Sequence, residues 1–344
     1  MRFGTEEVVI VTIRDVARRA GVSVATVSRV LNEPQTVREV KREIVLAAIA
    51  ELEFRPNLVA RGLATKSSGT IALIVSDIAN VFFAELVHQL EGPLAENGRD
   101  LLLCNTQERE DRLVRYLERV PLRGIDAVIL SPSPTLTPAV IDALEGLIAR
   151  NVPIVCSGAR MDGFDLPTIV NDSSKALEEL AEHLVSRGCR RIAYMGGPHH
   201  HAMSSSRLVT FSQALVRHGL QLEADLTRAI EYDPAIACEA VAELLLEAPD
   251  LDAVVCGGDQ LALGALKGLK EAGRRVPDDV AVTGFDDTYL AAYADPPLTS
   301  IAVNIDETAE AVTKAVLMAL RKEPVASSRV TSSLVIRQSS SLSV

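Results

Sequence analysis

The sequence predicts an N-terminal all-α helix-turn-helix headpiece followed by an α/β body of two parallel-sheet subdomains. The first observation is TIRDVARRAGVSVATVSRVLN at 12–32, which reads as a helix, a glycine turn and a second helix. The second is a long series of apolar runs separated by helical stretches, a pattern typical of parallel strands covered on both faces. The third is length, because 344 residues exceed one ordinary domain.

The first helix has a clear start and a clear stop. Thr12 can cap it, and Asp15, three residues later, can reach back to the N–H of the cap. An apolar stripe that includes Val16 gives the helix a buried side. Gly21 then supplies the positive φ that the turn needs.

The second helix runs from Val24 to about Leu31, and Ser23 caps it. Val27 and Val30 fall with Leu31 on one face, which we expect to pack inward. Small and basic residues form the other face: Val24, Ala25, Thr26, Ser28 and Arg29. Such a helix suits entry into the DNA major groove, although an ordinary αα-hairpin has the same outline.

Side-chain chemistry predicts how this face meets DNA. Arg29 is its only long donor, and guanine is the natural partner of arginine. We expect three residues at base edges: Val24, Ala25 and Arg29. We expect three more at backbone phosphates: Ser23, Thr26 and Ser28. Thr12 completes the predicted DNA contacts of the headpiece.

Net charge is distributed unevenly along the chain. The total of −11 by itself argues against DNA binding. Residues 12–66, however, hold ten Lys/Arg and six Asp/Glu, a net charge of +4, while residues 67–344 carry −14. A basic headpiece is attracted to phosphates and an acidic body is repelled by them, so the division favours DNA binding by the headpiece alone.

After a third amphipathic helix, about Arg38 to Leu52, the chain reads FRPNLVARGLATKSSGTIALIV. With VSVATVSRVLN before it and GFDD after it, this segment resembles the LacI/GalR family of bacterial transcription regulators. The resemblance extends from Thr12 to the C-terminus. It implies a periplasmic-binding-protein-like body in which the chain crosses between two halves three times, near 168, 300 and 331.

The chain therefore divides into four expected segments. These are a flexible extension at 1–11, the headpiece at 12–56, a hinge helix and linker at 57–68, and an effector-binding and dimerisation body at 69–344. The body is expected to split into an N-subdomain, about 69–167 plus 301–331, and a C-subdomain, about 168–300 plus 332–344.

The hinge adds further predicted DNA-binding residues. Asn57 can cap a short helix after Pro56. Val59 and Ala60 would pack one hinge against the other in a dimer. Leu63 resembles the family's wedge, an apolar side chain inserted between base pairs in the minor groove.

The body predicts a cleft between its halves, because ligands of such sheets bind beyond the carboxyl ends of the strands. Expected strands begin with Thr70–Val75 and continue through Ala127–Leu130, then Thr168–Val170, to Ile301–Val303. The residues that follow the strands, or open the next helix, are Asp77, Phe82, Phe83, Ser131, Asp172, Arg207, Asp259 and Asp286. Carboxylates with an arginine and aromatic rings suit a polyhydroxylated ligand.

The family resemblance implies roles for some of these residues. Arg207 in SRLVTFSQAL matches the ligand-clamping arginine, and Asp286 in GFDD matches an effector contact. Phe82 in NVFFAEL lies near the effector-facing aromatic. Tyr232 or Asp233 falls where an aromatic often closes the pocket.

The chain also departs from the family pattern, which leaves the effector's identity open. Val81 replaces the usual proline before the two aromatic residues. Gly258 stands where an asparagine commonly precedes Asp259, which removes a side-chain hydrogen bond. Asp172 is followed by Ser173 rather than by the commoner asparagine.

Several of these residues also have simpler explanations. In these explanations, Asp259 only caps the helix after it, and Asp286 only stabilises a turn. Likewise, Arg207 forms a structural ion pair, and Phe82 belongs to the hydrophobic core. His199–His201 invite a metal hypothesis, but adjacent residues cannot all face one ion on regular structure, so a ligand-touching loop is the preferred interpretation.

The remaining features predict a cytoplasmic protein without metal or cofactor. Five cysteines lack paired spacing and are interpreted as reduced, buried thiols: Cys104, Cys156, Cys189, Cys238 and Cys256. No run of 18 apolar residues is present, so no membrane span is expected, and EEVVIVTI is too short and too acidic at its flanks for a signal peptide.

Two rival classes share parts of this description. A transport binding protein would have the same body but a secretion signal in place of the helix-turn-helix. An enzyme would need a nucleophile elbow, a phosphate-binding loop or paired acids, and the corresponding glycine motifs are missing. We therefore expect a homodimeric repressor, with a tetramer as the alternative, that reads pseudo-palindromic DNA and is relieved by a sugar-like effector. A corepressor-dependent regulator that binds a nucleobase or sugar phosphate is the alternative function.

Overall fold

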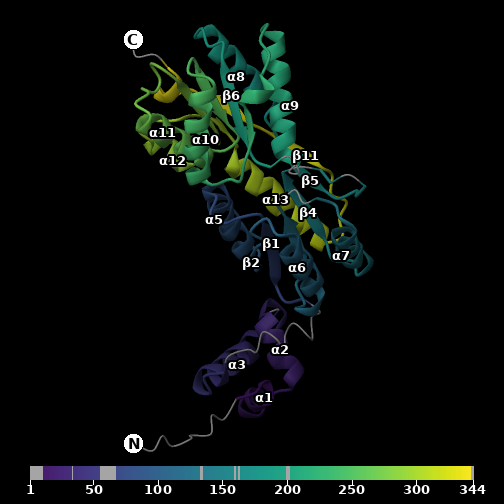
Figure 1. Ribbon diagram of the computed structural model, residues 1–344. Helices are drawn as coiled ribbons and strands as arrows, with labels where there is room; N and C mark the ends of the chain where they lie inside the picture. The colour runs from purple at the N-terminus through teal and green to yellow at the C-terminus, as the bar shows by residue number, and fades with distance from the viewer. Residues whose placement is uncertain are drawn as a thin grey trace, which may run out of the picture. The chain divides into compact units, whose positions relative to one another are not determined.

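The computed structural model describes residues 11–32, 34–54, 67–131, 135–158, 160–161, 163–198 and 202–341. The chain forms two compact units, residues 1–68 and 69–344 (Figure 1). The hinge predictions at Asn57, Val59, Ala60 and Leu63 lie outside the described residues, as do residues 1–10 and His199–His201.

The described part of the headpiece contains three α-helices and one short 3-10 helix around a small apolar core. Its elements are α1 (Ile13–Ala20), α2 (Val24–Asn32), η1 (Pro34–Thr36) and α3 (Glu39–Glu51). The core is shared by all three α-helices, and its fully buried members are Val16, Val27 and Val45. Phe54, shortly after the end of α3, also packs in this core.

The start and stop signals work as the sequence predicts. The Asp15 carboxylate accepts hydrogen bonds from the Thr12 N–H at 3.0 Å and from the Thr12 hydroxyl at 2.6 Å. Gly21 ends α1 with φ +65°, a conformation that costs glycine little. The Ser23 hydroxyl accepts from the Thr26 N–H at 3.2 Å and so caps α2. These contacts confirm the predicted helix-turn-helix.

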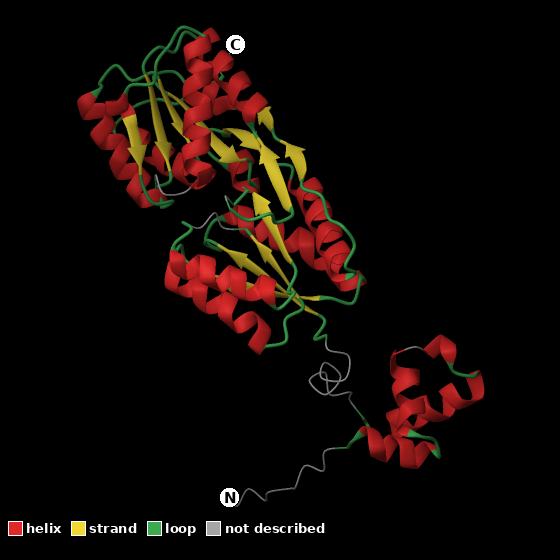
Figure 2. Ribbon diagram, turned by 90° about the vertical axis from the view of Figure 1, so that its right-hand side faces the viewer, coloured by secondary structure: helices red, strands yellow, loops and turns green. Residues whose placement is uncertain are grey.

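The body contains two six-stranded sheets, and we call the parts that hold them the first and the second half (Figure 2). The first sheet has the order β11 (Ser328–Thr331), β5 (Thr168–Asp172), β4 (Ile154–Gly158), β3 (Ala127–Leu130), β1 (Thr70–Val75) and β2 (Asp100–Asn105). The second has the order β12 (Ser333–Val335), β10 (Thr299–Ala302), β9 (Ala281–Asp286), β8 (Ala253–Cys256), β6 (Ile192–Gly196) and β7 (Thr227–Ala229).

Helices cover both faces of each sheet, which explains why the central strands read as continuous apolar runs. The first sheet is covered by α5 (Val81–Glu96) and α13 (Ile305–Leu320) on one face and by α6 (Glu110–Leu122) and α7 (Pro138–Ala149) on the other. The second is covered by α8 (Ser174–Ser186) and α9 (Ala202–Arg217) on one face and by α10 (Pro234–Glu247) and α11 (Asp259–Glu271) on the other. A short helix, α12 (Tyr289–Tyr293), follows β9.

The chain passes between the halves close to the positions expected from the sequence. β5 pairs in the first sheet, so the first crossing follows Asp172, a few residues after 168. β10 lies in the second sheet, so the second crossing follows Ala302, close to residue 300. The third lies between β11 and β12. Only the first two residues of β5 are buried, and so short an apolar run does not reveal which sheet it joins.

The sequence pattern also missed three strands and one strand direction. β7, β11 and β12 are three or four residues long and mostly exposed or half-buried, so they lack the apolar run of the central strands. β12 pairs antiparallel with β10, although the sheets were expected to be parallel. All of the missed strands lie at sheet edges, where burial is weakest.

Candidate functional site

The headpiece presents the polar face that the sequence predicts on α2. Val24, Ala25 and Arg29, the residues expected at base edges, are exposed, and the Val24 side chain is 41% accessible. Thr26 and Ser28, expected at phosphates, are half-buried. Ser23 and Thr26 also join their hydroxyls at 2.9 Å. The DNA contacts themselves stay a prediction.

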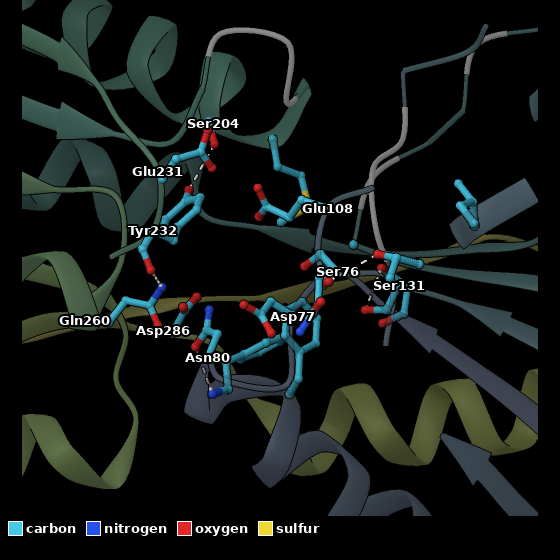
Figure 3. A pocket seen from close by; sticks show the side chains of 18 of the residues that line it. Ser76, Asp77, Asn80, Glu108, Ser131, Ser204, Glu231, Tyr232, Gln260 and Asp286 are labelled. Carbon is cyan, nitrogen blue, oxygen red and sulfur yellow. Dashed lines mark hydrogen bonds between the residues drawn. The ribbon is translucent and has the colours of Figure 1, made fainter. Parts of the chain in front are cut away.

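A cavity of about 470 Å³ opens between the two halves of the body, at the carboxyl ends of their strands. Figure 3 shows the side chains that line it from both sides. Seven of the predicted effector-binding residues line this cavity: Asp77, Phe82, Phe83, Ser131, Arg207, Tyr232 and Asp286. The structure thus brings together residues that lie far apart in the sequence, which we call the cleft.

Arg207, on α9 in the second half, is held firmly by its surroundings. Its guanidinium lies 3.5 Å from the centroid of the Phe285 ring and donates through Nη1 to the Gly257 carbonyl at 2.9 Å. Nη2 lies 3.7 Å from the Asp286 carboxylate. Arg207 therefore forms a structural ion pair and lines the cleft, so the two interpretations of this residue are compatible.

Asp286 ends β9 with a backbone φ of +94°, a conformation that residues other than glycine rarely adopt. Burial raises the pKa of its carboxyl, while the Arg207 charge and a hydrogen bond with the Asn80 side chain oppose that rise. Asn80 belongs to the first half, so this pair connects the two walls of the cleft. A buried charge that is only partly compensated is well placed to accept a ligand hydroxyl.

Tyr232 closes the second-half wall, and two glycines make room for its ring. A Cβ atom at Gly197 would lie 2.2 Å from Tyr232 Cε2, and one at Gly258 would lie 3.1 Å from Cε1. The Tyr232 hydroxyl shares a hydrogen bond with Ser204 Oγ at 2.9 Å, and its carbonyl accepts from Gln260 (Figure 3). The departure from the family at Gly258 leaves room for this ring, since a Cβ there would make a tight contact with it.

Two predicted effector-binding residues do not line the cleft. Asp259 is buried and accepts from the Thr288 N–H at 2.7 Å and from the Ser300 hydroxyl at 2.6 Å. It is the first residue of α11, whose N-cap is Gly258, so it does not cap the helix either. Its role is to fix the loop after β9, because Thr288 follows directly on Asp286 and Asp287.

Asp172 is held by a different set of contacts. This residue ends β5 at a crossing between the halves, and its carboxylate binds Arg329 at 3.0 Å and the Ser174 N–H at 3.1 Å. Its neighbour Asn171 lines the cleft instead and accepts from the Thr308 hydroxyl at 3.0 Å. Asp172 therefore belongs to the connection between the halves.

Phe82 is shared by the two halves. It lies in the first turn of α5, where the Asn80 side chain accepts from the Phe82 N–H at 3.0 Å. The ring packs against the core of the first sheet and also against the core of the second, while still lining the cleft. Phe83 meets it edge-on, with 5.3 Å between the ring centroids.

The sequence interpretation missed several residues that line the cleft. The clearest are Glu108, in the loop after β2, and Glu231, in the loop after β7. Glu231 was missed because β7, the strand before it, is too short and too exposed to be predicted from the sequence. Glu108 lies three residues beyond its strand with φ +56° and turns into the cleft. Gln260, next to Asp259, was overlooked for the same site.

Other features of the described residues bear on the remaining predictions. No helix among them has the length and apolar composition to span a membrane. Four of the five cysteines are buried, Cys238 is half-buried, and all are unpaired with one another. Because His199–His201 lie outside the described residues, the preference for a ligand-touching loop there stays a prediction.

Models of known protein families match both the headpiece and the body. Residues 12–57 match the model of bacterial regulatory proteins of the lacI family, and residues 181–340 match a periplasmic binding protein-like domain. The ribose operon repressor of Halalkalibacterium halodurans is 32% identical over 95% of this chain and 96% of its own length.

Solved structures resemble the chain over nearly its whole length. The Lac repressor dimer bound to operator and the anti-inducer ONPF has a TM-score of 0.84 at 28% identity, covering 96% of this chain and 98% of that one. The complex of the transcriptional regulator CelR with cellobiose has a TM-score of 0.72 at 29% identity, covering 96% and 99%. The first structure thus contains a regulator with operator and an anti-inducer, and the second contains a regulator with cellobiose.

Proposed function

The chain belongs to the lacI family of bacterial regulatory proteins, and on that premise we propose that it represses transcription as a homodimer whose affinity for operator DNA is set by a small sugar-like effector. It is a DNA-binding transcription regulator and not an enzyme. The remainder of the proposal concerns the sign of regulation, the ligand class and the assembly.

One observation carries the proposal. Both halves of the body line the same cavity, and the N-terminal unit of the chain contains a helix-turn-helix. Arg207 comes from the second half and Phe82 from the first. A ligand that touches both favours one relative orientation of the halves, and it shifts the population only by its differential affinity for the two orientations. In this proposal, the effector prefers the orientation that does not bind operator.

The lining supports a polyhydroxylated ligand. Asp77, Asp286 and Arg207 offer charged hydrogen-bonding groups, and Phe82 and Tyr232 offer ring faces for the apolar side of a sugar. The relatives named above include a ribose operon repressor and a regulator bound to cellobiose. A dimer follows from the size of the headpiece, since one small headpiece reads too few base pairs for specificity and two can read a pseudo-palindrome.

The proposal is tested in two steps. A randomised DNA pool and the chain's own upstream DNA are used to select an operator, which a specific regulator binds at nanomolar to subnanomolar affinity, roughly a thousandfold or more tighter than random DNA. Sugars, sugar phosphates and purines are then screened by thermal shift, and those that raise the melting temperature are added to the operator complex. We expect a sugar to release the DNA. Tighter operator binding with a purine would instead support the corepressor alternative, and failure to select any operator would contradict the proposal.

A further inference from the structure

A hydrogen bond joins the two halves of the body outside the cleft. The Tyr289 N–H, at the start of α12 in the second half, donates to Glu85 Oε1, on α5 in the first half, at 3.0 Å. Figure 1 shows α5 and α12 at the boundary between the halves. Neither Glu85 nor Tyr289 lines the cleft. This contact, which we call the Glu85–Tyr289 bond, therefore connects the halves without belonging to the ligand site.

The donor of this bond is fixed to the second half. Thr288, directly before it, donates to the Asp259 carboxylate through its N–H at 2.7 Å and through its hydroxyl at 3.0 Å. Because Tyr289 is the first residue of α12, its own N–H has no partner inside the helix, and Glu85 supplies one. The N–H therefore cannot follow Glu85 if the first half moves away.

The acceptor is fixed to the first half. Glu85 lies in the second turn of α5, and both Leu86 and Leu90 of this helix are fully buried in the core of the first sheet. Phe82, one turn earlier, packs against the cores of both halves. Any rotation of the halves therefore changes the distance between Glu85 and the Tyr289 N–H, and an increase of about 1 Å already breaks a hydrogen bond.

The Glu85–Tyr289 bond is suited to reversible use. A carboxylate acceptor makes it a charge-assisted bond, but Glu85 is only half-buried and Tyr289 is 59% exposed, so water competes for both groups. We propose that Glu85 is a positioning residue, whose bond to Tyr289 favours the relative orientation of the halves seen here and breaks when the halves take the other orientation. This inference rests on the proposed function, in which operator DNA and effector prefer different orientations.

Two substitutions remove the bond from opposite sides. Glu85→Ala removes the acceptor, and Tyr289→Pro removes the donor. Proline suits the first position of a helix, and Thr288 before it has φ −59° and ψ 158°, which a following proline allows. Tyr289→Ala, which loses the ring but keeps the N–H, is the reference for Tyr289→Pro. Glu96→Ala, which removes an exposed acid farther along α5, is the control for Glu85→Ala.

The first measurement is the affinity of the full-length protein for the operator selected above, by fluorescence anisotropy. Glu85→Ala should change this affinity by about 2- to 10-fold, the range of one hydrogen bond in contact with water. Tyr289→Pro, compared with Tyr289→Ala, should change it by a similar factor in the same direction. The double variant should match the single variants to within about twofold, because both substitutions remove the same bond. Glu96→Ala should match the wild type.

The second measurement is hydrogen exchange of the Tyr289 N–H itself, by NMR. Without DNA, Glu85→Ala should speed this exchange and leave the Thr288 N–H, which Asp259 binds within the second half, unchanged. Operator must then act on the wild type with the matching sign. If Glu85→Ala weakens operator binding, operator slows exchange at Tyr289, and if it strengthens binding, operator speeds exchange. A contact that only stabilised the fold would not respond to DNA.

The inference is overturned if operator affinity is the same in all variants, if the two single effects add in the double variant, or if operator leaves exchange at Tyr289 unchanged or moves it with the wrong sign. Failure of the proposed function has a different outcome. If no operator can be selected, the regulator is rejected, and the bond is judged on exchange without DNA, where equal rates in the wild type and Glu85→Ala overturn it. Normal operator binding and sugar response in the Glu85→Ala variant would reject the inference and leave the regulator intact.

Discussion

The headpiece and the body hold their recognition residues in opposite ways. On α2 of the headpiece, Val24, Ala25 and Arg29 are exposed, and the backbone beneath them is set by a cap and a turn a few residues away. In the cleft, Arg207 and Asp286 are largely buried, and each depends on residues far away in the sequence. The difference teaches that the predicted DNA-binding face is formed by residues close together in the sequence, whereas the cleft is formed by residues from the whole body.

The largest effect that would separate the two parts is expected from Arg207→Ala. It removes the group that joins the Phe285 ring, the Gly257 carbonyl and Asp286, and with it the guanidinium that we propose binds the effector. Operator affinity should remain near wild type but stay flat across an effector titration, a loss of coupling on the order of 1–3 kcal/mol. Fluorescence anisotropy with labelled operator measures both quantities.

Arg217→Ala provides the control for that measurement, because Arg217 lies at the end of the same helix and pairs with Glu178 at the surface. It should respond to effector like the wild type. If Arg207→Ala loses operator binding while the body stays folded and dimeric, Arg207 does not belong to the effector site. Asp286→Ala should have the same phenotype as Arg207→Ala.

Gly197→Ala should disturb the cleft without touching the headpiece. The new Cβ would lie 2.2 Å from Tyr232 Cε2, so the ring must move. We expect a loss of unfolding free energy of about 1–3 kcal/mol together with weaker effector binding. Tyr232→Ala should lower the free energy of unfolding less in the Gly197→Ala background than in the wild type, because removal of the ring then also relieves the collision, as measured by urea unfolding.

Gly92→Ala, on α5, is the matched control, since a Cβ there meets nothing within 4 Å. It should leave stability unchanged or slightly higher, because alanine favours a helix over glycine. Equal destabilisation by both substitutions would show that the collision with Tyr232 is not the cause.

Arg29→Ala should affect the headpiece alone. We expect operator affinity to fall by roughly 1–3 kcal/mol and selectivity to relax at one base-pair position, while the effector still binds the body normally. Binding to a set of operators that differ at single positions measures this. Arg18→Ala, which removes an exposed arginine of α1 paired with Asp15, is the comparison. Uniform weakening across all operators would make Arg29 a phosphate contact.

The last prediction is a pH dependence of the body's stability caused by Asp259. Burial and the Asp286 charge raise the pKa of Asp259 to about 7 from 3.8. Between these values the folded state holds a proton that the unfolded state releases, so this group makes the protein less stable as pH rises from about 4 to about 7. The Asp259→Asn variant has no titrating carboxyl at this position. The difference in unfolding free energy between this variant and the wild type should therefore shift in favour of the variant from pH 5 to pH 8. If urea unfolding shows that this difference in unfolding free energy is independent of pH, the prediction is wrong.

The same division explains what could be predicted from the sequence. The helix-turn-helix depends on Thr12, Asp15, Gly21 and Ser23, all of which act within a few residues of their own position. The central strands of the body were equally visible, because a strand buried on both faces needs a continuous apolar run. The cleft followed from the rule that ligands bind at the carboxyl ends of parallel strands.

The individual cleft residues were harder to predict for a physical reason. A carboxylate just after a strand looks the same in the sequence whether it meets ligand or protein. Asp172 meets Arg329, and Asp259 meets Ser300, and neither distant partner is visible from the local pattern. Glu231 was missed because β7 is a short edge strand without an apolar run. The geometry of the second-half wall, including the space at Gly197 for the Tyr232 ring, arises only from packing.

The position of Phe82 has a consequence for the speed of switching. Because this ring packs against the cores of both halves, the halves cannot rotate past each other without first withdrawing it from one of them. Close-packed contacts of this kind give discrete arrangements with a barrier between them rather than a continuous range. The size of this one side chain should therefore set how long the molecule remains in each arrangement, and so how fast a gene under its control could follow a change in its surroundings.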